Sequence, residues 1–287
     1  MTGINVAIPN TVFVKPIYNV RCSGGARFNK NVGNAIFAAV RPTPYTKKIT
    51  PNATEDIIII DIETVSEKPV FSELEDYWQQ LWQGKVEKQL PADVTASDFY
   101  EQRAGVMAEF SKIVCISMGY FMKEPQLRMR IKSFYGHDEK IILTNFLETM
   151  LKIEGRNNKW CFAGHNIKEF DIPFICRRLL INRIPIPRFL DFQNMKPWET
   201  NLVDTFQYWR FGDYKNFTSL KLLAAALDVP SPKDDIDGSM VGKVYWQEND
   251  LERIKIYCQK DVATVGNIFL RLKGKGLVHP DDIEYVK

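Results

Sequence analysis

Ten residues, EDIIIIDIET (55–64), constrain the chain more than any other stretch. Four consecutive isoleucines predict a β-strand that is buried on both faces. Asp61 and Glu63 follow at its end, where an unpaired buried charge would be costly. Because side chains alternate along a strand, both carboxylates point to the same side. The pair therefore predicts one half of a site for a hard cation such as Mg²⁺, and the other half must come from elsewhere in the chain.

Length and composition indicate a globular protein with no membrane segment. The 287 residues allow one large domain or two small ones, and 45% hydrophobic with 25% charged residues supply an ordinary core and surface. No apolar stretch is long enough to cross a bilayer, and the first residues lack the layout of a secretory signal. The 5 cysteines are widely spaced without a CxxC pair, which fits a reducing cytoplasm and disfavours zinc or disulfides.

The charge distribution divides the chain into an extension and a body. Residues 1–54 contain seven basic residues and no acidic ones, with Gly, Pro and Asn throughout. We expect a poorly ordered basic extension, or a true start near the first strand, because Pro9 and Pro16 disfavour the amphipathic helix of a transit segment. Residues 55–287 form the expected domain. Within it, 112–221 contain 18 basic and 11 acidic residues, which suits either a polyanionic ligand or an ordinary solvated surface.

Hydrophobic periods predict an α/β protein with a mixed sheet. Residues 66–110 are expected to be a helical insertion, with an apolar stripe over 72–90 and a second helix opened by Thr95 and Asp98 and running to Phe110. Strands are predicted at 112–121 and 127–136, joined as an antiparallel hairpin, and at 160–163 and 201–208. Helices are predicted at 138–154, 168–182, from a cap at Thr218 or Ser219, and at 250–272. Interleaved strands and helices indicate a sheet flanked by helices.

Two segments offer the missing half of the site. In HNIKEFDIPFI (165–175), Asp171 follows a buried strand and stands among inward-facing apolar residues, so it needs a partner unless it lies on the solvent face beside Pro173. In RIKIYCQKDVATV (253–265), Tyr257 and Asp261 are one helical turn apart and share a face. A YxxxD pair is weak evidence alone. It gains weight from the order of the motifs along the chain. Two carboxylates on the first strand come first, one carboxylate on a middle helix comes next, and the YxxxD pair on the last helix comes third.

These segments carry a resemblance to a known family. DIET, HNIKEFD and YCQKD resemble the three motifs of the DEDD-type 3′–5′ exonucleases, which have a ribonuclease H-like fold. The resemblance covers roughly 55–272 and is strongest to stand-alone bacterial exonucleases related to the proofreading domain of family-B DNA polymerases. The histidine subclass has His five residues before the last Asp, where this chain has Ile256. Tyr257 stands where the tyrosine subclass has its Tyr. The insertion and the N-terminal extension depart from the family pattern.

The resemblance implies roles for eight residues. Two divalent ions, Mg²⁺ or Mn²⁺, would be held by four carboxylates: Asp61 on both ions, Glu63 and Asp261 on the ion that activates water, and Asp171 on the second. Tyr257 would orient the attacking water. The terminal nucleotide would be contacted by the backbone of Thr64 and by Asn166 and Phe170, the last by stacking.

The expected activity is the release of nucleoside 5′-monophosphates from the 3′ end of DNA, single-stranded by expectation, in repair or processing in the cytoplasm. A protein partner in replication or repair is left unidentified. RNA 3′-end trimming is an alternative, because discrimination would depend on a contact to the 2′-hydroxyl. The absence of a recognisable RNA-binding domain favours DNA. Two further alternatives are a non-catalytic nucleic-acid-binding module on this fold and an endonuclease or integrase, the latter disfavoured by the YxxxD helix.

Overall fold

The computed structural model describes residues 54–123, 125–155, 159–196, 199–230 and 236–286 of the chain. All of these belong to one compact unit, Lys48–Lys287. Residues 1–53, which hold nearly all of the predicted basic extension, lie outside the described residues, as does part of the linker SPKDDIDGS.

A single mixed sheet forms the centre of this unit. Its strands are β1 (Ile57–Ser66), β2 (Ser111–Met122), β3 (Arg128–Tyr135), β4 (Cys161–Gly164), β5 (Leu202–Asp204) and β6 (Ile283–Val286), in the order β5-β4-β1-β2-β3-β6. The β1-β2 and β2-β3 pairs are antiparallel, which confirms the predicted hairpin, whereas β1-β4, β4-β5 and β3-β6 are parallel. The predictions missed β6, a short edge strand at the C-terminal end.

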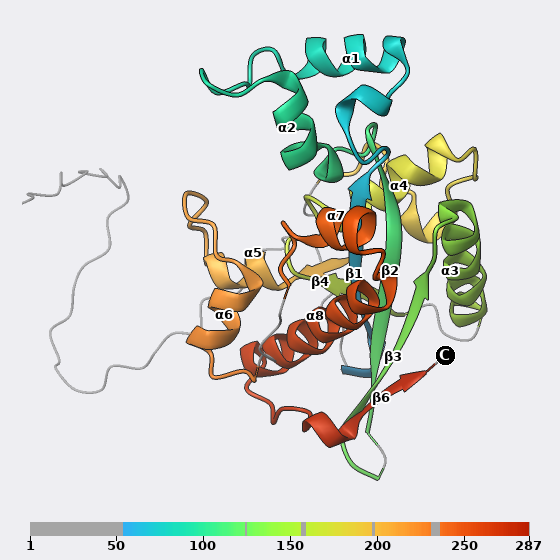
Figure 1. Ribbon diagram of the computed structural model, residues 1–287. Helices are drawn as coiled ribbons and strands as arrows, with labels where there is room; N and C mark the ends of the chain where they lie inside the picture. The colour runs from blue at the N-terminus through green and yellow to red at the C-terminus, as the bar shows by residue number, and fades with distance from the viewer. Residues whose placement is uncertain (1–53, 124, 156–158, 197–198, 231–235, 287) are drawn as a thin grey trace, which may run out of the picture. The chain divides into compact units, whose positions relative to one another are not determined.

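Helices cover both faces of the sheet. The helices are α1 (Asp76–Val86) and α2 (Ala96–Arg103), which belong to the insertion, and α3 (Glu139–Glu154), α4 (Asp171–Ile181), α5 (Thr205–Arg210), α6 (Leu220–Ala226), α7 (Val241–Lys243) and α8 (Leu251–Leu272). Figure 1 shows α8 running across β1, β2 and β3, all of which it contacts. The predicted α/β class and the mixed sheet flanked by helices are confirmed.

The isoleucine run of β1 is buried on both faces, as predicted. Ile58, Ile60 and Ile62 belong to the core beneath α3 and α4, whereas Ile57 and Ile59 pack with residues of α8. The alternation has a direct consequence for the site. Continuing the period of two, the side chains of residues 61 and 63 emerge on the α8 side of the sheet.

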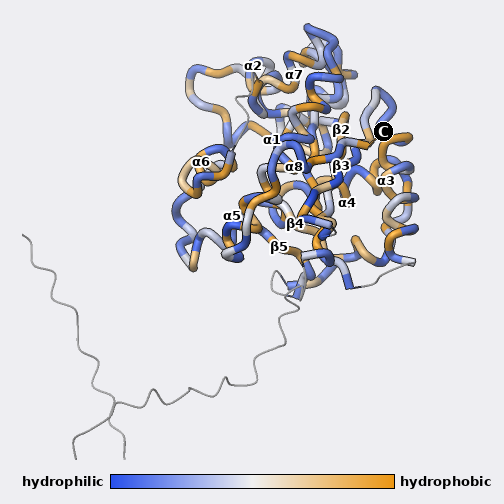
Figure 2. Tube along the Cα trace, turned by 90° about the horizontal axis from the view of Figure 1, so that it is seen from below, coloured by the Kyte–Doolittle hydropathy of each residue, from blue (hydrophilic) through white to orange (hydrophobic). Residues whose placement is uncertain are grey.

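Side-chain caps begin the helices near the predicted positions. Asp138, Ser219 and Asp250 each accept a hydrogen bond from a backbone amide in the first turn of α3, α6 and α8. The hydropathy tube in Figure 2 shows orange and blue alternating along α3, as expected for a helix with one buried side.

Three predicted boundaries are wrong. The strand predicted at 201–208 ends at Asp204, because this carboxylate caps α5 by accepting from the amides of Phe206 and Gln207. The helix predicted from 168 begins only at Asp171, after a turn over 167–170. The helix predicted to reach Phe110 ends at Arg103 and continues as a 3₁₀ turn, Ala104–Val106, against β1.

The insertion forms a small layer with its own core. Thr95 caps α2 by accepting from the amide of Asp98, as predicted. Trp82 is fully buried there with Tyr100. The stripe predicted over 72–90 is only partly inward, since Tyr77 is 66% exposed. The hydroxyl of Thr64 donates to the Gly105 carbonyl at 2.6 Å, so the insertion is fastened to the carboxyl end of β1.

No helix among the described residues is long and apolar enough to span a membrane.

Candidate active site

Two carboxylates and a thiol converge at the carboxyl end of β1. Ligand atoms of Asp61, Glu63 and Cys258 lie within 4.8 Å of one another. Glu63 is buried and Asp61 half-buried, and both face α8 as the strand alternation requires. The thiol of Cys258 donates to Asp61 Oδ2 at 3.3 Å and lies 3.5 Å from its backbone oxygen. Cys258 therefore joins α8 to the first predicted carboxylate.

Asp171 joins this group from the opposite helix layer. It is the first residue of α4 and only 4% exposed, so the alternative that placed it on the solvent face is wrong. Its Oδ1 accepts a hydrogen bond from the amide of Ile62 at 3.2 Å. Ile62 separates Asp61 from Glu63 in β1, and the helix N-terminus favours a negative charge at this position. The predicted proximity of Asp171 to the strand pair is thus observed.

Tyr257 and Asp261 lie one turn apart on α8, on either side of Cys258. A side-chain hydrogen bond connects the tyrosine hydroxyl to the Asp261 carboxylate. Burial, followed by the negative charges of Asp261, Glu63 and Asp61, raises the pKa of Tyr257 far above its ordinary value. The hydroxyl therefore keeps its proton at any working pH and can donate it to a hydrogen-bond acceptor.

Electrostatics mark the cluster as a cation site. Burial, and then repulsion by Asp171 and Asp261, raises the pKa of Asp61 well above its usual range. Burial, and then repulsion by Asp61 and Asp261, does the same to the pKa of Glu63. Burial raises the pKa of Asp171 to about 7, although amide hydrogen bonds oppose the shift.

Carboxylates in this state repel one another and lack the solvation that would stabilise their charge. A divalent cation relieves both problems, and carboxylate oxygens are the ligands that Mg²⁺ and Mn²⁺ prefer. The residues present therefore fit such an ion. Cys258, a soft donor, is already engaged as a hydrogen-bond donor to Asp61.

The three residues predicted to contact the nucleotide lie on different segments. Thr64 follows Glu63 in β1, at a register shift between the two residues. Asn166 has a left-handed backbone with φ 62°, and its Oδ1 is buried without a hydrogen-bond partner among the described residues. Phe170 precedes Asp171 and contacts the ring of Phe174 at a centroid distance of 5.3 Å. A buried amide oxygen without a partner is a candidate for a ligand contact.

Sequence reasoning missed two residues that shape this surface. Asp204 is 1% exposed at the end of β5, and its carboxylate accepts from the amides of Asn166 and Lys168. His165 contacts the Thr205 hydroxyl through Nδ1 and the Thr218 carbonyl through Nε2. Burial lowers the pKa of His165. The position of Asp204 after a strand was a usable signal, because carboxyl ends of neighbouring parallel strands meet at one edge.

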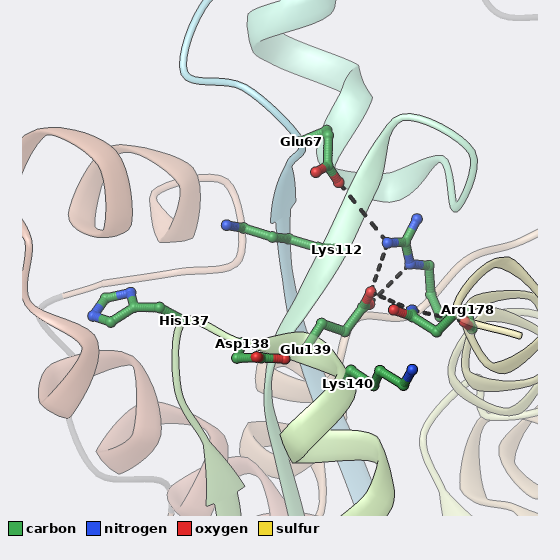
Figure 3. Close-up of a pocket in the computed structure, with 8 residues that line it drawn as sticks. Glu67, Lys112, His137, Asp138, Glu139, Lys140 and Arg178 are labelled. Carbon is green, nitrogen blue, oxygen red and sulfur yellow. Dashed lines mark hydrogen bonds and ion pairs between the residues drawn. The ribbon is translucent and has the colours of Figure 1, made fainter. Parts of the chain in front are cut away.

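A surface pocket of about 480 Å³ lies elsewhere and contains none of the predicted site residues. Figure 3 shows Arg178 and Glu139 facing each other in it, with Glu67 above. Arg178 donates two hydrogen bonds to Glu139, at 2.8 and 2.6 Å, and a third to the Ala108 carbonyl. Glu139 also accepts from the Ile113 amide. This ion pair holds α3, α4 and β2 together, so the pocket is structural.

Known proteins are similar to this chain over most of the domain. The family B DNA polymerase from the hyperthermophilic archaeon Pyrobaculum calidifontis is a similar solved structure, with 15% sequence identity and a TM-score of 0.44. The match covers 75% of this chain and 24% of the polymerase, so the chain spans about a quarter of that protein. A search of curated proteins found no match.

A family described as "Predicted 3'-5' exonuclease related to the exonuclease domain of PolB" matches residues 106–283. The matched range includes Asp171, Tyr257 and Asp261 and begins near the end of the insertion, beyond Asp61 and Glu63. Because it covers more than half of the chain, the protein belongs to this family of predicted 3′–5′ exonucleases related to the exonuclease domain of PolB.

Proposed function

We propose that this protein is a metal-dependent 3′–5′ exonuclease of the tyrosine subclass. It removes nucleoside 5′-monophosphates from the 3′ end of single-stranded DNA in repair or processing. The observation that carries the proposal is the meeting of Asp61 and Glu63 with Cys258 of α8, beside which Asp171 of α4 is held by its hydrogen bond from the Ile62 amide. Raised pKa values of all three carboxylates support a cation as their missing partner.

Four carboxylates are proposed to hold two Mg²⁺ or Mn²⁺ ions. Asp61 would contact both ions, Glu63 and Asp261 the first, and Asp171 the second. When bound, such ions neutralise charge on the phosphate and lower the pKa of water. The chain supplies the acidic ligands and a buried, poorly solvated setting in which their charge acts strongly.

Tyr257 is proposed to orient the attacking water. With its pKa raised by burial and by Asp261, the hydroxyl stays protonated and is not a general base; its hydrogen is donated to Asp261, so its oxygen would accept from the water. Its hydrogen bond to Asp261 fixes the ring in the site. A bound ion would lower the pKa of this water, and Tyr257 would hold the water in place.

The terminal nucleotide is proposed to lie against Thr64, Asn166 and Phe170. The unpaired Oδ1 of Asn166 would accept a hydrogen bond from a sugar hydroxyl, and the Asn166 backbone amide is held by Asp204. Phe170 is half-buried, so one part of its ring is available for stacking on the terminal base.

Product analysis tests this proposal. Single- and double-stranded DNA and RNA of one sequence, labelled at the 5′ end, should be incubated with Mg²⁺, Mn²⁺ or chelator. We expect a ladder of shortening single-stranded DNA with 5′-mononucleotides, and none with chelator. If RNA is shortened faster than DNA, the alternative function, RNA 3′-end trimming, is the correct one. Binding without metal-dependent cleavage of any strand would mean a non-catalytic module.

A further inference from the structure

Three aromatic side chains stand out of one short loop beside the predicted nucleotide contacts. The loop joins α5 to α6 and covers residues 211–218. Phe211 is 90% exposed, Tyr214 77% and Phe217 67%. Single exposed apolar residues are normal, but three aromatic residues within seven positions form a patch that calls for a ligand.

The loop is held in shape by contacts of its own. Phe211 has a left-handed backbone with φ 45°, an uncommon conformation for an aromatic residue. Asp213 accepts from the Lys215 amide at 3.0 Å and from the Asn216 side chain at 2.8 Å. The Phe217 ring meets the buried Phe206 edge-on at 4.9 Å. Because the loop is already ordered, a ligand that stacks on it loses little entropy in fixing it.

Contacts at both of its ends join the loop to the turn that precedes Asp171. At its start, the Arg210 guanidinium stacks on Phe206 at 3.8 Å and reaches Glu169 at 3.6 Å. At its end, the Thr218 carbonyl lies 2.9 Å from His165 Nε2. His165 directly precedes Asn166, and Glu169 directly precedes Phe170. The aromatic loop therefore borders the predicted position of the terminal nucleotide.

Charge around the loop selects the kind of ligand. Lys215 and Lys221 are exposed within and just beyond it. The one acidic side chain of the loop, Asp213, is engaged by Lys215 and Asn216. Exposed aromatic rings interleaved with exposed lysines match unpaired nucleic acid, whose bases stack on the rings while phosphates meet the lysines. An apolar protein partner would gain nothing from the lysines.

We propose that Phe211 and Tyr214 form a stacking platform for the unpaired bases that precede the 3′-terminal nucleotide. This inference rests on the proposed exonuclease function and extends it to the substrate strand. The platform recognises bases by stacking and not by their hydrogen-bonding edges, so it is indifferent to sequence. It makes a single strand of several nucleotides the preferred substrate over a dinucleotide or a fully paired end.

Binding in the presence of chelator tests the platform without catalysis. Two fluorescent DNA strands of about 12 nucleotides are compared by anisotropy, one with all its bases and one abasic except at its 3′ terminus. The wild type should bind the full strand at least about tenfold more tightly than the abasic strand. The variant Phe211→Ala/Tyr214→Ala should bind both strands with the same affinity. That affinity should equal the affinity of the wild type for the abasic strand.

Two further variants control for folding and for general loss of aromatic surface. Phe211→Trp/Tyr214→Phe keeps the rings and should retain the wild-type preference. Tyr285→Ala removes an aromatic side chain that is 50% exposed on β6, at the sheet edge opposite β5, and should also retain it. If the alanine double variant still prefers the full strand, the platform is wrong. If that variant keeps the preference and instead loses self-association, the aromatic loop is a protein contact.

Hydrolysis of a small substrate separates this inference from the proposed function. The p-nitrophenyl ester of thymidine 5′-monophosphate reaches the metal site but not the loop. We expect the alanine double variant to hydrolyse the ester with Mn²⁺ at the wild-type rate while its kcat/KM on the full strand falls at least about tenfold. If the wild type hydrolyses neither substrate, the exonuclease proposal fails, while the chelator binding experiment still reports on the platform.

Discussion

Asp171 accepts a hydrogen bond from the backbone amide of Ile62 at 3.2 Å, across 109 residues of sequence. Ile62 is the residue between the two carboxylates of β1, so this bond sets the distance between α4 and both of them. It is also an amide-to-carboxylate bond that favours the charged form of Asp171. Burial outweighs it, and the pKa of Asp171 rises to about 7.

Stability without metal should therefore depend on Asp171 and on pH. Its folded pKa of about 7 exceeds the ordinary 3.8, so the stability that its protonated form contributes is lost as pH rises through about 7. In chelator, the free energy of unfolding of Asp171→Asn relative to wild type should increase between about pH 5 and pH 8, by on the order of 2 kcal/mol. Urea denaturation measures it.

Asp213→Asn is the matched control for this pH dependence. The pKa of Asp213 is lowered by hydrogen bonds from Lys215 and Asn216, so its charged form stabilises the fold. Its stability contribution is lost only as pH falls below the ordinary 3.8, so between about pH 5 and pH 8 the difference between Asp213→Asn and wild type should stay constant. A difference between Asp171→Asn and wild type that stays constant with pH would contradict the account of the cluster.

Tyr257→Phe should lower the rate and spare the metal. The hydroxyl is the only group removed, and water orientation of this kind contributes on the order of 100-fold in kcat. Metal affinity should be unchanged, as measured by the rise in melting temperature when Mn²⁺ is added. Tyr135→Phe, on β3, is the control and should keep full activity. Full activity of Tyr257→Phe would remove the tyrosine from the chemistry.

Cys258 is expected to tune the metal site through Asp61. Its thiol donates to Asp61 Oδ2, and this hydrogen bond lowers the pKa of Asp61 against the effect of burial. Cys258→Ala removes the donor and should raise the Mg²⁺ concentration for half-maximal activity by up to about tenfold. Cys258→Ser restores a donor and should recover most of this loss. An equal loss in both variants would show that the sulfur itself is required.

The pocket around Arg178 should matter for stability alone. Arg178→Met leaves Glu139 buried and unpaired, which should cost roughly 3–5 kcal/mol in urea denaturation. Adding Glu139→Gln should recover part of the loss. The exposed Lys140 lines the same pocket, so Lys140→Met should change little. If Arg178→Met is destabilised and Arg178→Met/Glu139→Gln is no more stable, the loss comes from packing and not from the unpaired charge of Glu139.

Much of the sheet could be predicted because its signals are local. Four isoleucines in a row require burial on both faces, and the end of β1 places Asp61 and Glu63 on one side. The residue Asp138 before an apolar helix marks a cap, and the alternation of Met129 and Ile131 marks a half-buried strand. These patterns depend on neighbours in sequence, so no tertiary information was needed to find them.

The remaining parts depend on contacts that are distant in sequence. Asp204 ends β5 and caps α5, and the two further hydrogen bonds that it accepts from the amides of Asn166 and Lys168 join segments that lie far apart in sequence. Edge strand β6 is four residues long and pairs only with β3. Cys258 resembles an ordinary core cysteine in the helix and becomes part of the site only because β1 brings Asp61 against it.

The most direct test of the central claim is the digestion of a 5′-labelled single strand by wild type and Asp61→Ala with Mg²⁺ or Mn²⁺. The account predicts progressive shortening from the 3′ end by the wild type and none by Asp61→Ala, which should remain folded because its loss relieves repulsion in the cluster. Equal degradation by both proteins would contradict the assignment of Asp61 and of the metal site built around it.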